Sequence, residues 1–403
     1  MRVLWFSPVS SCYEQSLAGG WVASLEEAVK NYCKDIELGI VFEYSHTGKD
    51  TKNNVTYYSI NVKHERSPRT RFYLLKPYYI KAINDFKPDI IQCFGTERWH
   101  YGLLAKEINI PFVIHIMGFM NIYDLMDERV IHKSDYWKYF GYNPLKVWLN
   151  HKTYSTRKEN QQLEREIMAS NHYFMGRTNW DKNIVKYYSH NAKYFYCAEV
   201  IRKEIYNSID RWHFHNREKV HLLTVGNAGS LKGNEIMLQA AWLLKNRFNF
   251  DFEWNYTSSK EAMAFFEKLN GIRCSDVNIK LIGRLKADQI AKELSEADFY
   301  IHPAIIDNSP NTVCEAQLIG TPVIATNVGG IPQLVENGHT GWLYPYSEPH
   351  ALAFKIMNLY KQKALLQHVS DNEYKLSHER HNPEAIVKRL DSIYKEVIND
   401  WNS

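Results

Sequence analysis

Two acidic residues, Asp307 and Glu315, stand eight positions apart in the segment His302–Tyr344. A carboxylate can accept two hydrogen bonds from the neighbouring hydroxyl groups of a ribose, and Glu315 is placed for this about one turn into a predicted helix. The helix dipole alone also favours an acidic residue in a first turn, so a purely structural Glu315 is the alternative. Asp307 lies on the loop that leads to this helix, where its carboxylate could meet the same ligand.

The residues around this pair predict a strand, a loop and a helix in succession. The strand ends at Pro303, and Asn311 can cap a helix over Thr312–Leu318. The first turn then offers free backbone amides beyond the carboxyl end of a parallel strand, which favours a bound phosphate. The pair Gly329-Gly330 permits a second close approach of backbone to a ligand, although such a pair is more often only a turn.

A second segment, Leu222–Lys245, predicts a strand, a glycine-rich loop that begins at Gly226, and an amphipathic helix preceded by Lys232. The backbone N–H groups of such a loop, together with a lysine, form a cradle for a diphosphate. A solvated loop lysine is the alternative, because that is the commoner role of an isolated lysine before a glycine.

These two segments resemble the donor site of glycosyltransferase family 4, a family of retaining enzymes with the GT-B fold. The resemblance implies that Glu315 binds the ribose and that Asp307, which stands where the family more often has Glu, lies near the hydroxyl groups of the transferred sugar. It also implies metal-independent transfer, with Lys232 and helix dipoles in the part of a metal ion. The same resemblance places five further residues beside the sugar and the phosphates: Asn308, Ser309, Asn311, Thr312 and Val313.

Members of this family usually carry an arginine just after the first glycine of the diphosphate loop, and here Asn227 follows Gly226. Either another cation reaches the phosphates, for which Arg177 and Arg202 are the candidates, or catalysis is weaker than in other members of the family. Arg284 corresponds to a position that often lines the pocket for the nucleotide base.

The N-terminal half carries weaker matches to the same family. The pair Gly19-Gly20 follows the first predicted strand, where the family binds donor phosphates and acceptor, and a plain strand-to-helix turn is the alternative. Met117 replaces the histidine that is often found near the reacting sugar, and His115 is interpreted as a buried structural residue. The acceptor-side candidates are Glu97, His100 and Gly118.

Short runs of branched and aromatic residues alternate with segments of helical apolar spacing, which predicts parallel sheets covered by helices on both faces. The pattern breaks across the polar residues 207–219 and then restarts. We therefore expect an α/β fold, GT-B by resemblance, with two Rossmann-like doubly wound domains facing each other across a cleft. The predicted parts are an acceptor-binding domain (1–205), a linker (206–219), a nucleotide-sugar-binding domain (220–381) and an amphipathic C-terminal helix (382–403) that could pack back on the N-terminal domain.

The composition limits the class of protein. A chain of 403 residues, with 45% apolar and 23% charged residues, is large enough for two globular domains. The six cysteines stand singly, without the spacing of a zinc site or a disulfide framework, and no apolar run approaches about 20 residues, so we expect a cytoplasmic location. No metal-binding or nucleic-acid-binding motif is recognised, and no cofactor is expected.

The net charge of +4 arises in the N-terminal half, where the segments Lys63–Lys81 and Lys133–Lys158 mix cations with aromatic residues. These segments predict either a solvated charged face over an ordinary core or peripheral contact with an anionic membrane, which would bring a lipid-linked acceptor to the protein.

The sequence thus predicts a retaining glycosyltransferase that moves a sugar from a nucleotide diphosphate sugar to a glycan or lipid-linked saccharide acceptor, in the synthesis of a surface polysaccharide or glycoconjugate. Two other interpretations stay open. One is a non-catalytic scaffold subunit that binds a nucleotide sugar, which Asn227 and Met117 motivate, and the other is a sugar-nucleotide epimerase of the same fold.

Overall fold

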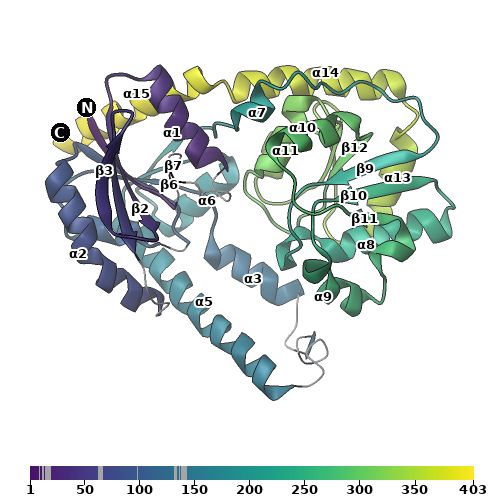
Figure 1. Cartoon of the computed structure of the whole chain (residues 1–403), viewed down its shortest axis with the longest axis horizontal. Coiled ribbons are helices and arrows are strands. Elements are labelled where there is room, and N and C mark those ends of the chain that lie inside the picture. The colour runs from purple at the N-terminus through teal and green to yellow at the C-terminus, as the bar shows by residue number, and fades with distance from the viewer. Residues whose placement is uncertain are drawn as a thin grey trace. The chain divides into compact units, whose positions relative to one another are not determined.

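A computed structural model describes residues 1–8, 10, 13, 20–61, 67–97, 99–130, 134–135, 137 and 143–403. The chain forms two compact units, each with its own sheet and helices (Figure 1): the first comprises residues 1–124, 149–201 and 381–403, and the second residues 125–148 and 202–380. The predicted α/β fold with two doubly wound units is confirmed.

The sheet of the first unit has eight strands: β1 (Arg2–Phe6), β2 (Glu37–Tyr44), β3 (Gly48–Lys52), β4 (Val55–Asn61), β5 (Ile90–Phe94), β6 (Phe112–His115), β7 (Tyr173–Gly176) and β8 (Lys193–Tyr196). Their order is β3-β4-β2-β1-β5-β6-β7-β8, and all neighbours pair in parallel except β3 with β4. The strands added after β1 first lie on one side of it and then, from β5 onward, on the other. Ligands of open parallel sheets bind beyond the carboxyl ends of the strands at such a reversal.

The hairpin of β3 and β4 was not predicted from the sequence. Asn53 and Asn54 connect the two strands with φ angles of 52° and 62°, a left-handed conformation that suits a two-residue hairpin turn and that Asn adopts readily. Every residue of β3 is exposed, so no alternation of apolar and polar side chains marks it as a strand. The antiparallel β3 makes this sheet mixed, where a purely parallel sheet was expected.

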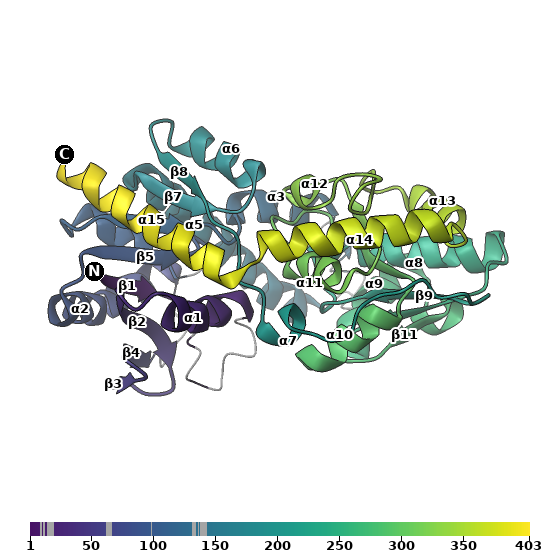
Figure 2. The same ribbon diagram turned by 90° about the horizontal axis from the view of Figure 1, so that it is seen from above.

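Helices α1 (Gly20–Tyr32) and α15 (Pro383–Asn402) share a hydrophobic core on one face of this sheet (Figure 2). The amphipathic C-terminal helix is confirmed, since its predicted apolar stripe is buried: Ile386, Leu390, Ile393, Tyr394 and Val397. The Tyr394 hydroxyl accepts a hydrogen bond from Trp5 Nε1 at 2.9 Å and donates one to Gln92. The last segment of the chain is therefore part of the core of the first unit.

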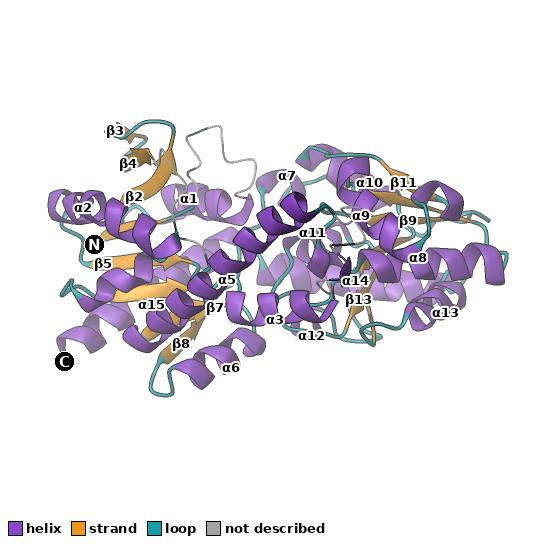
Figure 3. Cartoon of the chain, turned by 90° about the horizontal axis from the view of Figure 1, so that it is seen from below, coloured by secondary structure: helices purple, strands orange, loops and turns teal. Residues whose placement is uncertain are grey.

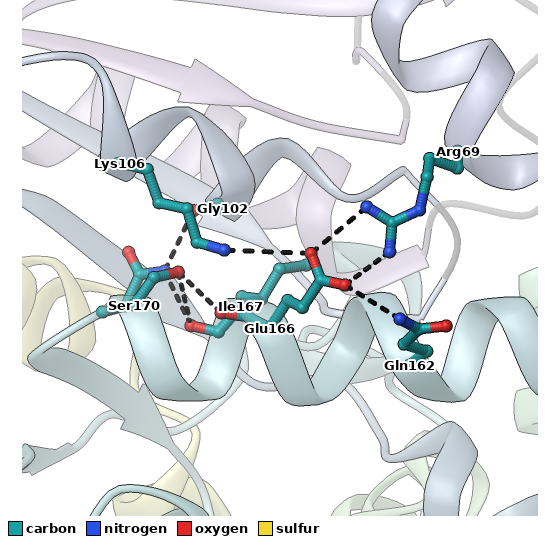
Figure 4. Close-up of polar contacts among 8 residues, drawn as sticks. Arg69, Gly102, Lys106, Gln162, Glu166, Ile167 and Ser170 are labelled. Atoms are coloured by element: carbon teal, nitrogen blue, oxygen red, sulfur yellow. Dashed lines mark hydrogen bonds and ion pairs between the residues drawn. The ribbon is translucent and has the colours of Figure 1, made fainter.

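The other face of the sheet is covered by α2 (Pro68–Phe86), the short helix η1 (Tyr101–Lys106), α5 (Pro144–Ser170) and α6 (Asn179–Tyr188). Figure 4 shows a polar cluster that joins three of these helices. Glu166 of α5 accepts hydrogen bonds from Arg69 of α2, at 3.3 Å for one of them, and from Gln162 at 3.4 Å, and it lies 3.8 Å from Lys106 of η1. A further helix, α3 (Met120–Val130), follows β6.

The sheet of the second unit has six strands: β9 (Val220–Thr224), β10 (Phe252–Tyr256), β11 (Ile279–Leu281), β12 (Phe299–His302), β13 (Val323–Thr326) and β14 (Trp342–Tyr344). All pair in parallel in the order β11-β10-β9-β12-β13-β14, which is the doubly wound order of nucleotide-binding folds. The strand β14 was not predicted. In this unit the reversal of strand order falls between β9 and β12.

Helices surround this sheet, as Figure 3 shows with helices in purple and strands in orange. They are α7 (Lys203–Tyr206), α8 (Asn234–Trp242), α9 (Lys260–Asn270), α10 (Ala287–Glu296), α11 (Asn311–Ile319), α12 (Ile331–Leu334), α13 (Pro349–Leu359) and α14 (Lys363–Arg380), with the short helices η2 (Ser230–Lys232), η3 (Leu243–Arg247) and η4 (Cys274–Val277). Helix α8 packs on α9 and α13, and α11 packs on α7, α10 and α14.

The predicted linker 206–219 is ordered within the second unit. Trp212 is fully buried there, and its backbone N–H and indole N–H donate to the carbonyl groups of Ile319 at 2.8 Å and Ala297 at 2.7 Å. The polar residues of this segment thus surround one large apolar residue that anchors it. The segment is a structural part of the second unit rather than a flexible linker.

Helix α14 contains a buried carboxyl group, Glu373, with no hydrogen-bond partner for either oxygen among the described residues. Burial raises the pKa of Glu373 well above its usual value, although the charge of Arg380 lowers it in part. Because the pKa is higher in the folded state than in the unfolded one, the free energy of unfolding falls as the pH rises from the ordinary carboxyl range toward the raised pKa.

We therefore predict that Glu373→Met raises the free energy of unfolding at pH 8 by about 1–3 kcal/mol and changes it less at pH 4.5. Denaturant unfolding at both pH values measures this difference. The matched control is Glu379→Gln, because Glu379 is exposed on the same helix. An equal effect at both pH values would show that Glu373 ionises freely in the folded protein.

Candidate active site

The carboxyl ends of β9 and β12, where the strand order of the second unit reverses, carry the residues that the sequence singled out. The loop after β9 leads through Gly226 and Asn227 to Lys232, and the loop after β12 leads from Pro303 to Asp307. Open parallel sheets bind their ligands at this position. The topology thus places both predicted donor-site segments at one edge of one sheet.

Close packing fastens these two loops to each other. Gly233 has φ of 64°, and a β-carbon at this position would lie 1.8 Å from the carbonyl oxygen of Pro303. The N–H of Ile305 donates to the carbonyl of Leu231 at 2.9 Å. Only glycine fits this approach, and as a result Lys232 lies directly opposite the loop after β12.

Lys232 and Asp307 form an ion pair, with 3.0 Å between Nζ and Oδ2. The side chain of Lys232 is 46% exposed, whereas that of Asp307 is 16% exposed. Burial acts to raise the pKa of Asp307, but the charge of Lys232 and the neighbouring His302 outweigh it and hold this pKa below the usual value. The carboxylate is therefore ionised at neutral pH.

His302, at the end of β12, was not predicted as a site residue. Its Nε2 lies 3.6 Å from Oδ2 of Asp307, and its Nδ1 lies 3.2 Å from the Tyr300 hydroxyl. Burial lowers the pKa of His302, although Asp307 acts to raise it. The signal was present in the sequence, because a histidine that ends a strand of a parallel sheet lies at the ligand-binding edge.

The pair Gly329-Gly330 lies against the backbone of the loop after β12, at the carbonyl group of Asp307. A β-carbon at Gly329 would lie 2.0 Å from the carbonyl oxygen of Asp307, and the N–H of Gly330 donates to the same oxygen at 3.0 Å. This approach is made to the chain's own backbone and supports the loop that carries Asp307, whereas the sequence suggested an approach to a ligand.

Glu315 of α11 is buried, with an exposed fraction of 4%, and is held by Arg202. Both Nε and one terminal nitrogen of Arg202 contact Oε1, at 2.7 and 2.6 Å. Its Oε2 is buried and has no hydrogen-bond partner among the described residues. Burial raises the pKa of Glu315, and Arg202 acts against this rise. Arg202, considered from the sequence as a cation for the phosphates, therefore already contacts Glu315.

The N-terminus of α11 differs in detail from the prediction. Pro310 occupies the capping position and Asn311 is the first helical residue, so Asn311 does not cap the helix. Val313 is buried, and its N–H donates to the carbonyl of Pro310 at 3.0 Å, so this amide is not available to a phosphate. Asn308 and Ser309 are also buried, and the Asn308 N–H donates to Oδ1 of Asp307 at 3.0 Å.

The remaining donor-side residues lie on the loop after β9, on the loop after β11 and in the first turn of α11. Gly226 has φ of 143°, and its N–H donates to the Thr257 hydroxyl at 2.8 Å. Asn227, in the usual arginine position, accepts a hydrogen bond from Ser258 at 3.1 Å. Arg284 is exposed and follows β11, the edge strand, so it lies on a different loop from Lys232 and Asp307. Thr312 is partly exposed in the first turn of α11.

In the first unit the reversal of strand order falls between β1 and β5. Gly19 lies outside the described residues, and Gly20 is the first residue of α1. Glu97 follows β5 and Gly118 follows β6, so both lie at the carboxyl edge of the sheet.

The histidines of this unit are buried. His115 is the last residue of β6, lies 3.2 Å from Gln92 through Nδ1, and has its pKa lowered by burial to about 3. His100 precedes η1 in a left-handed conformation, and burial lowers its pKa to about 4. Both imidazoles are therefore neutral at neutral pH, and among the described residues no hydrogen bond joins His100 to Glu97 or Gly118.

Arg177 follows β7 and lies within the first unit. It donates to the carbonyl of Met117 at 3.1 Å, lies 3.8 Å from Glu199 and has its guanidinium over the ring of Trp21. Among the described residues, no group of three His, Cys, Asp or Glu side chains has the arrangement of a metal site.

Comparison with known proteins agrees with this architecture. Residues 219–362 match the family described as Glycosyl transferases group 1. The chain is 24% identical to an uncharacterised glycosyltransferase of Methanocaldococcus jannaschii over 94% of this chain and 95% of the relative. It is 26% identical to the amylovoran biosynthesis glycosyltransferase AmsK of Erwinia amylovora over 36% of this chain and 37% of the relative.

Among solved structures, HepE of Anabaena in complex with UDP-glucose resembles the chain with a TM-score of 0.67, over 98% of this chain and 100% of that one, at 12% identity. This likeness concerns the fold, whereas the family match and the relatives concern the activity. The chain is therefore a glycosyltransferase of the GT-B fold, and its second unit matches the group 1 family over residues 219–362.

Proposed function

We propose that the protein transfers a sugar from a nucleotide diphosphate sugar to a saccharide acceptor with retention of the anomeric configuration. The observation that carries the proposal is the ion pair of Lys232 and Asp307 at the reversal point of a six-stranded parallel sheet. The likeness to HepE, whose complex contains UDP-glucose, supports a nucleotide-sugar donor.

In this proposal Lys232 neutralises the diphosphate. The bond between the anomeric carbon and the diphosphate oxygen breaks, the acceptor oxygen bonds to the same face of that carbon, and the acceptor proton leaves with the diphosphate. The negative charge that grows on the leaving group is the charge that a nearby ammonium stabilises most. No metal ion is needed for this step.

The two carboxylates bind different parts of the donor. Glu315 offers Oε2 to the ribose, because Arg202 already contacts Oε1. Asp307 contacts hydroxyl groups of the transferred sugar, and it must exchange Lys232 for the donor when the diphosphate binds. The backbone near Asn308 and Ser309 lies beside the sugar, and the first turn of α11 lies beside the phosphates.

The acceptor is a glycan or a lipid-linked saccharide, and the first unit binds it at the carboxyl edge of its sheet. The similarity to a glycosyltransferase of amylovoran biosynthesis supports a role in the synthesis of a surface polysaccharide or glycoconjugate. Such a reaction takes place in the cytoplasm or at the inner face of the plasma membrane.

We predict that Lys232→Ala lowers the rate of sugar transfer by about 10²–10³-fold but the thermal unfolding temperature by only about 2–4 °C, since the ion pair that is lost is partly exposed. The assay screens UDP-, GDP- and ADP-sugars in EDTA, and Lys292→Ala, another exposed lysine of this unit, is the control. Normal turnover by Lys232→Ala would contradict the assignment. Epimerised donor, or donor binding without turnover, would favour an epimerase or a scaffold instead.

The two carboxylates should differ in their effect on nucleotide affinity. Glu315→Gln should weaken the binding of the nucleotide diphosphate by about 10–100-fold, because a charged hydrogen-bonding group is lost. Asp307→Asn should instead strengthen it by up to about fivefold, because Lys232 is released from a partly exposed ion pair, while sugar transfer falls. Calorimetry with the free nucleotides measures both. Equal weakening by the two variants would refute the division of roles.

We propose that the first unit contacts a membrane through exposed apolar side chains of α2 rather than through basic residues. Arg69, Arg71 and Lys76 of α2 pair with Glu166, Glu43 and Glu107, so these cations do not form the free basic surface that the sequence suggested. The exposed side chains of α2 include Tyr73, Leu74 and Tyr78, which suit a membrane interface.

Lys63 and Arg66, and most of the segment 133–142, lie outside the described residues. Among the helices that the structure describes, none has the length and apolar character of a membrane span. Contact by α2 would therefore be peripheral.

We predict that the protein binds vesicles that contain phosphatidylserine and that the double variant Leu74→Ser, Tyr78→Ser binds them about tenfold more weakly, since two apolar side chains no longer leave water. Tyr187→Ser, at an exposed site on α6, is the matched control. Sedimentation with and without phosphatidylserine, at low and high salt, measures the binding. No binding to either vesicle type would make α2 an ordinary solvated helix.

A further inference from the structure

The first unit has its own reversal of strand order, between β1 and β5, and the loop after β5 carries Gly95, Thr96 and Glu97. This is the position at which an open parallel sheet binds its ligand. The donor residues described above belong to the second unit. A titratable group on this loop therefore has no assigned role in donor binding.

Two glycines make room for the carboxyl group of Glu97. Gly95 has φ of 80°, and a β-carbon there would lie 2.2 Å from Oε2 of Glu97. A β-carbon at Gly118, after β6, would lie 3.0 Å from Oε1. The N–H of Thr96 donates to Oε2 at 2.9 Å. The carboxyl group of Glu97 thus lies against the backbone at the edge of the sheet, and the Thr96 N–H holds it through Oε2.

The loop itself is anchored by a second carboxylate, Glu164 of α5. It accepts hydrogen bonds from the Thr96 hydroxyl at 2.9 Å and from the N–H groups of Met120 and Asn121, at the start of α3, at 3.0 and 2.8 Å. Glu164 is fully buried and occupied by these donors, as expected of a structural residue at a helix N-terminus.

Glu97 differs from Glu164 in two respects. Its side chain is partly exposed, and no hydrogen bond within the described part of the chain reaches Oε1. One oxygen is therefore held by the protein, and the other is presented at the ligand-binding edge.

The groups that face Glu97 come from three elements. Glu164 approaches from α5, Arg177 from the loop after β7, and the ring of Tyr123 of α3 lies against Gly118 beside it. Burial and the charge of Glu164 raise the pKa of Glu97 to about 7, and Arg177 acts against this rise. A change of pH near neutrality consequently changes the charge of this group.

We propose that Oε1 of Glu97 accepts a hydrogen bond from a hydroxyl group of the saccharide acceptor and so positions the acceptor for transfer. The inference rests on the proposed function, because it assumes a hydroxyl-bearing acceptor. The ionised carboxylate is the better hydrogen-bond acceptor, so acceptor use increases as Glu97 loses its proton.

The test uses the full-length protein, UDP-glucose or the donor found in the nucleotide screen, and a panel of p-nitrophenyl glycosides as acceptors. In the wild type, kcat/KM for the acceptor should rise with pH through a pKa near 7. Glu97→Gln should lower this value by about 10–100-fold above pH 7.5 and abolish the rise, with the affinity for free nucleotide unchanged. Glu107→Gln, at an exposed carboxylate that follows η1, should behave as the wild type.

Glu97→Asp serves as a second variant in case the amide disturbs the loop, because it keeps the charge but withdraws it from the edge. It should keep the pH dependence with reduced kcat/KM. A Glu97→Gln enzyme with wild-type acceptor kinetics and pH profile would overturn the inference, and so would equal losses in nucleotide affinity and in acceptor use, which would indicate a structural role. A wild-type enzyme that binds no nucleotide and transfers to no glycoside would instead contradict the proposed function, and with it this inference.

Discussion

The candidate donor site depends on one steric constraint, the approach of Gly233 to the carbonyl group of Pro303. A β-carbon at Gly233 would lie 1.8 Å from that oxygen and clash with it, so no other residue fits without separating the loops after β9 and β12. The hydrogen bond from Ile305 to Leu231 and the ion pair of Lys232 with Asp307 both cross the same junction. Lys232 and Asp307, which we propose bind the diphosphate and the sugar, are thereby brought together from positions that are far apart in the sequence.

Three carboxyl groups at the edges of the two sheets have different electrostatic surroundings, and the difference suits different tasks. Asp307 lies beside a lysine and a histidine, so it stays ionised. Glu315 is buried but held through one oxygen by Arg202, which leaves the second oxygen as an oriented acceptor. Burial and the like charge of Glu164 raise the pKa of Glu97 to about 7, and no described cation forms an ion pair in hydrogen-bond contact with it. Environment rather than residue type separates these groups.

The sequence supports prediction wherever a short segment determines its own structure. The strands of both sheets other than β3, β4 and β14, the helix after Asp307 and the buried stripe of α15 follow from apolar spacing and from glycine and proline positions. The prediction fails where contacts with residues distant in the sequence determine the structure. Trp212 anchors a polar segment in the second unit, and Arg69 and Arg71 form ion pairs with carboxylates on other elements instead of a free basic surface. The exposed strand β3 fails for the opposite reason, since it has no buried face to produce a pattern.

The ion pair of Lys232 and Asp307 also bears on what kind of ligand the site selects. Without a donor, the ammonium already has a negative partner, so an incoming phosphate gains only the difference between two attractive interactions. A single weakly charged group would gain little from such an exchange. A diphosphate carries more charge, and under the proposed function its sugar gives Asp307 hydroxyl donors in place of the ammonium, so that both members of the broken pair find new partners. On the proposed function, the pair therefore favours a complete nucleotide sugar over fragments of it.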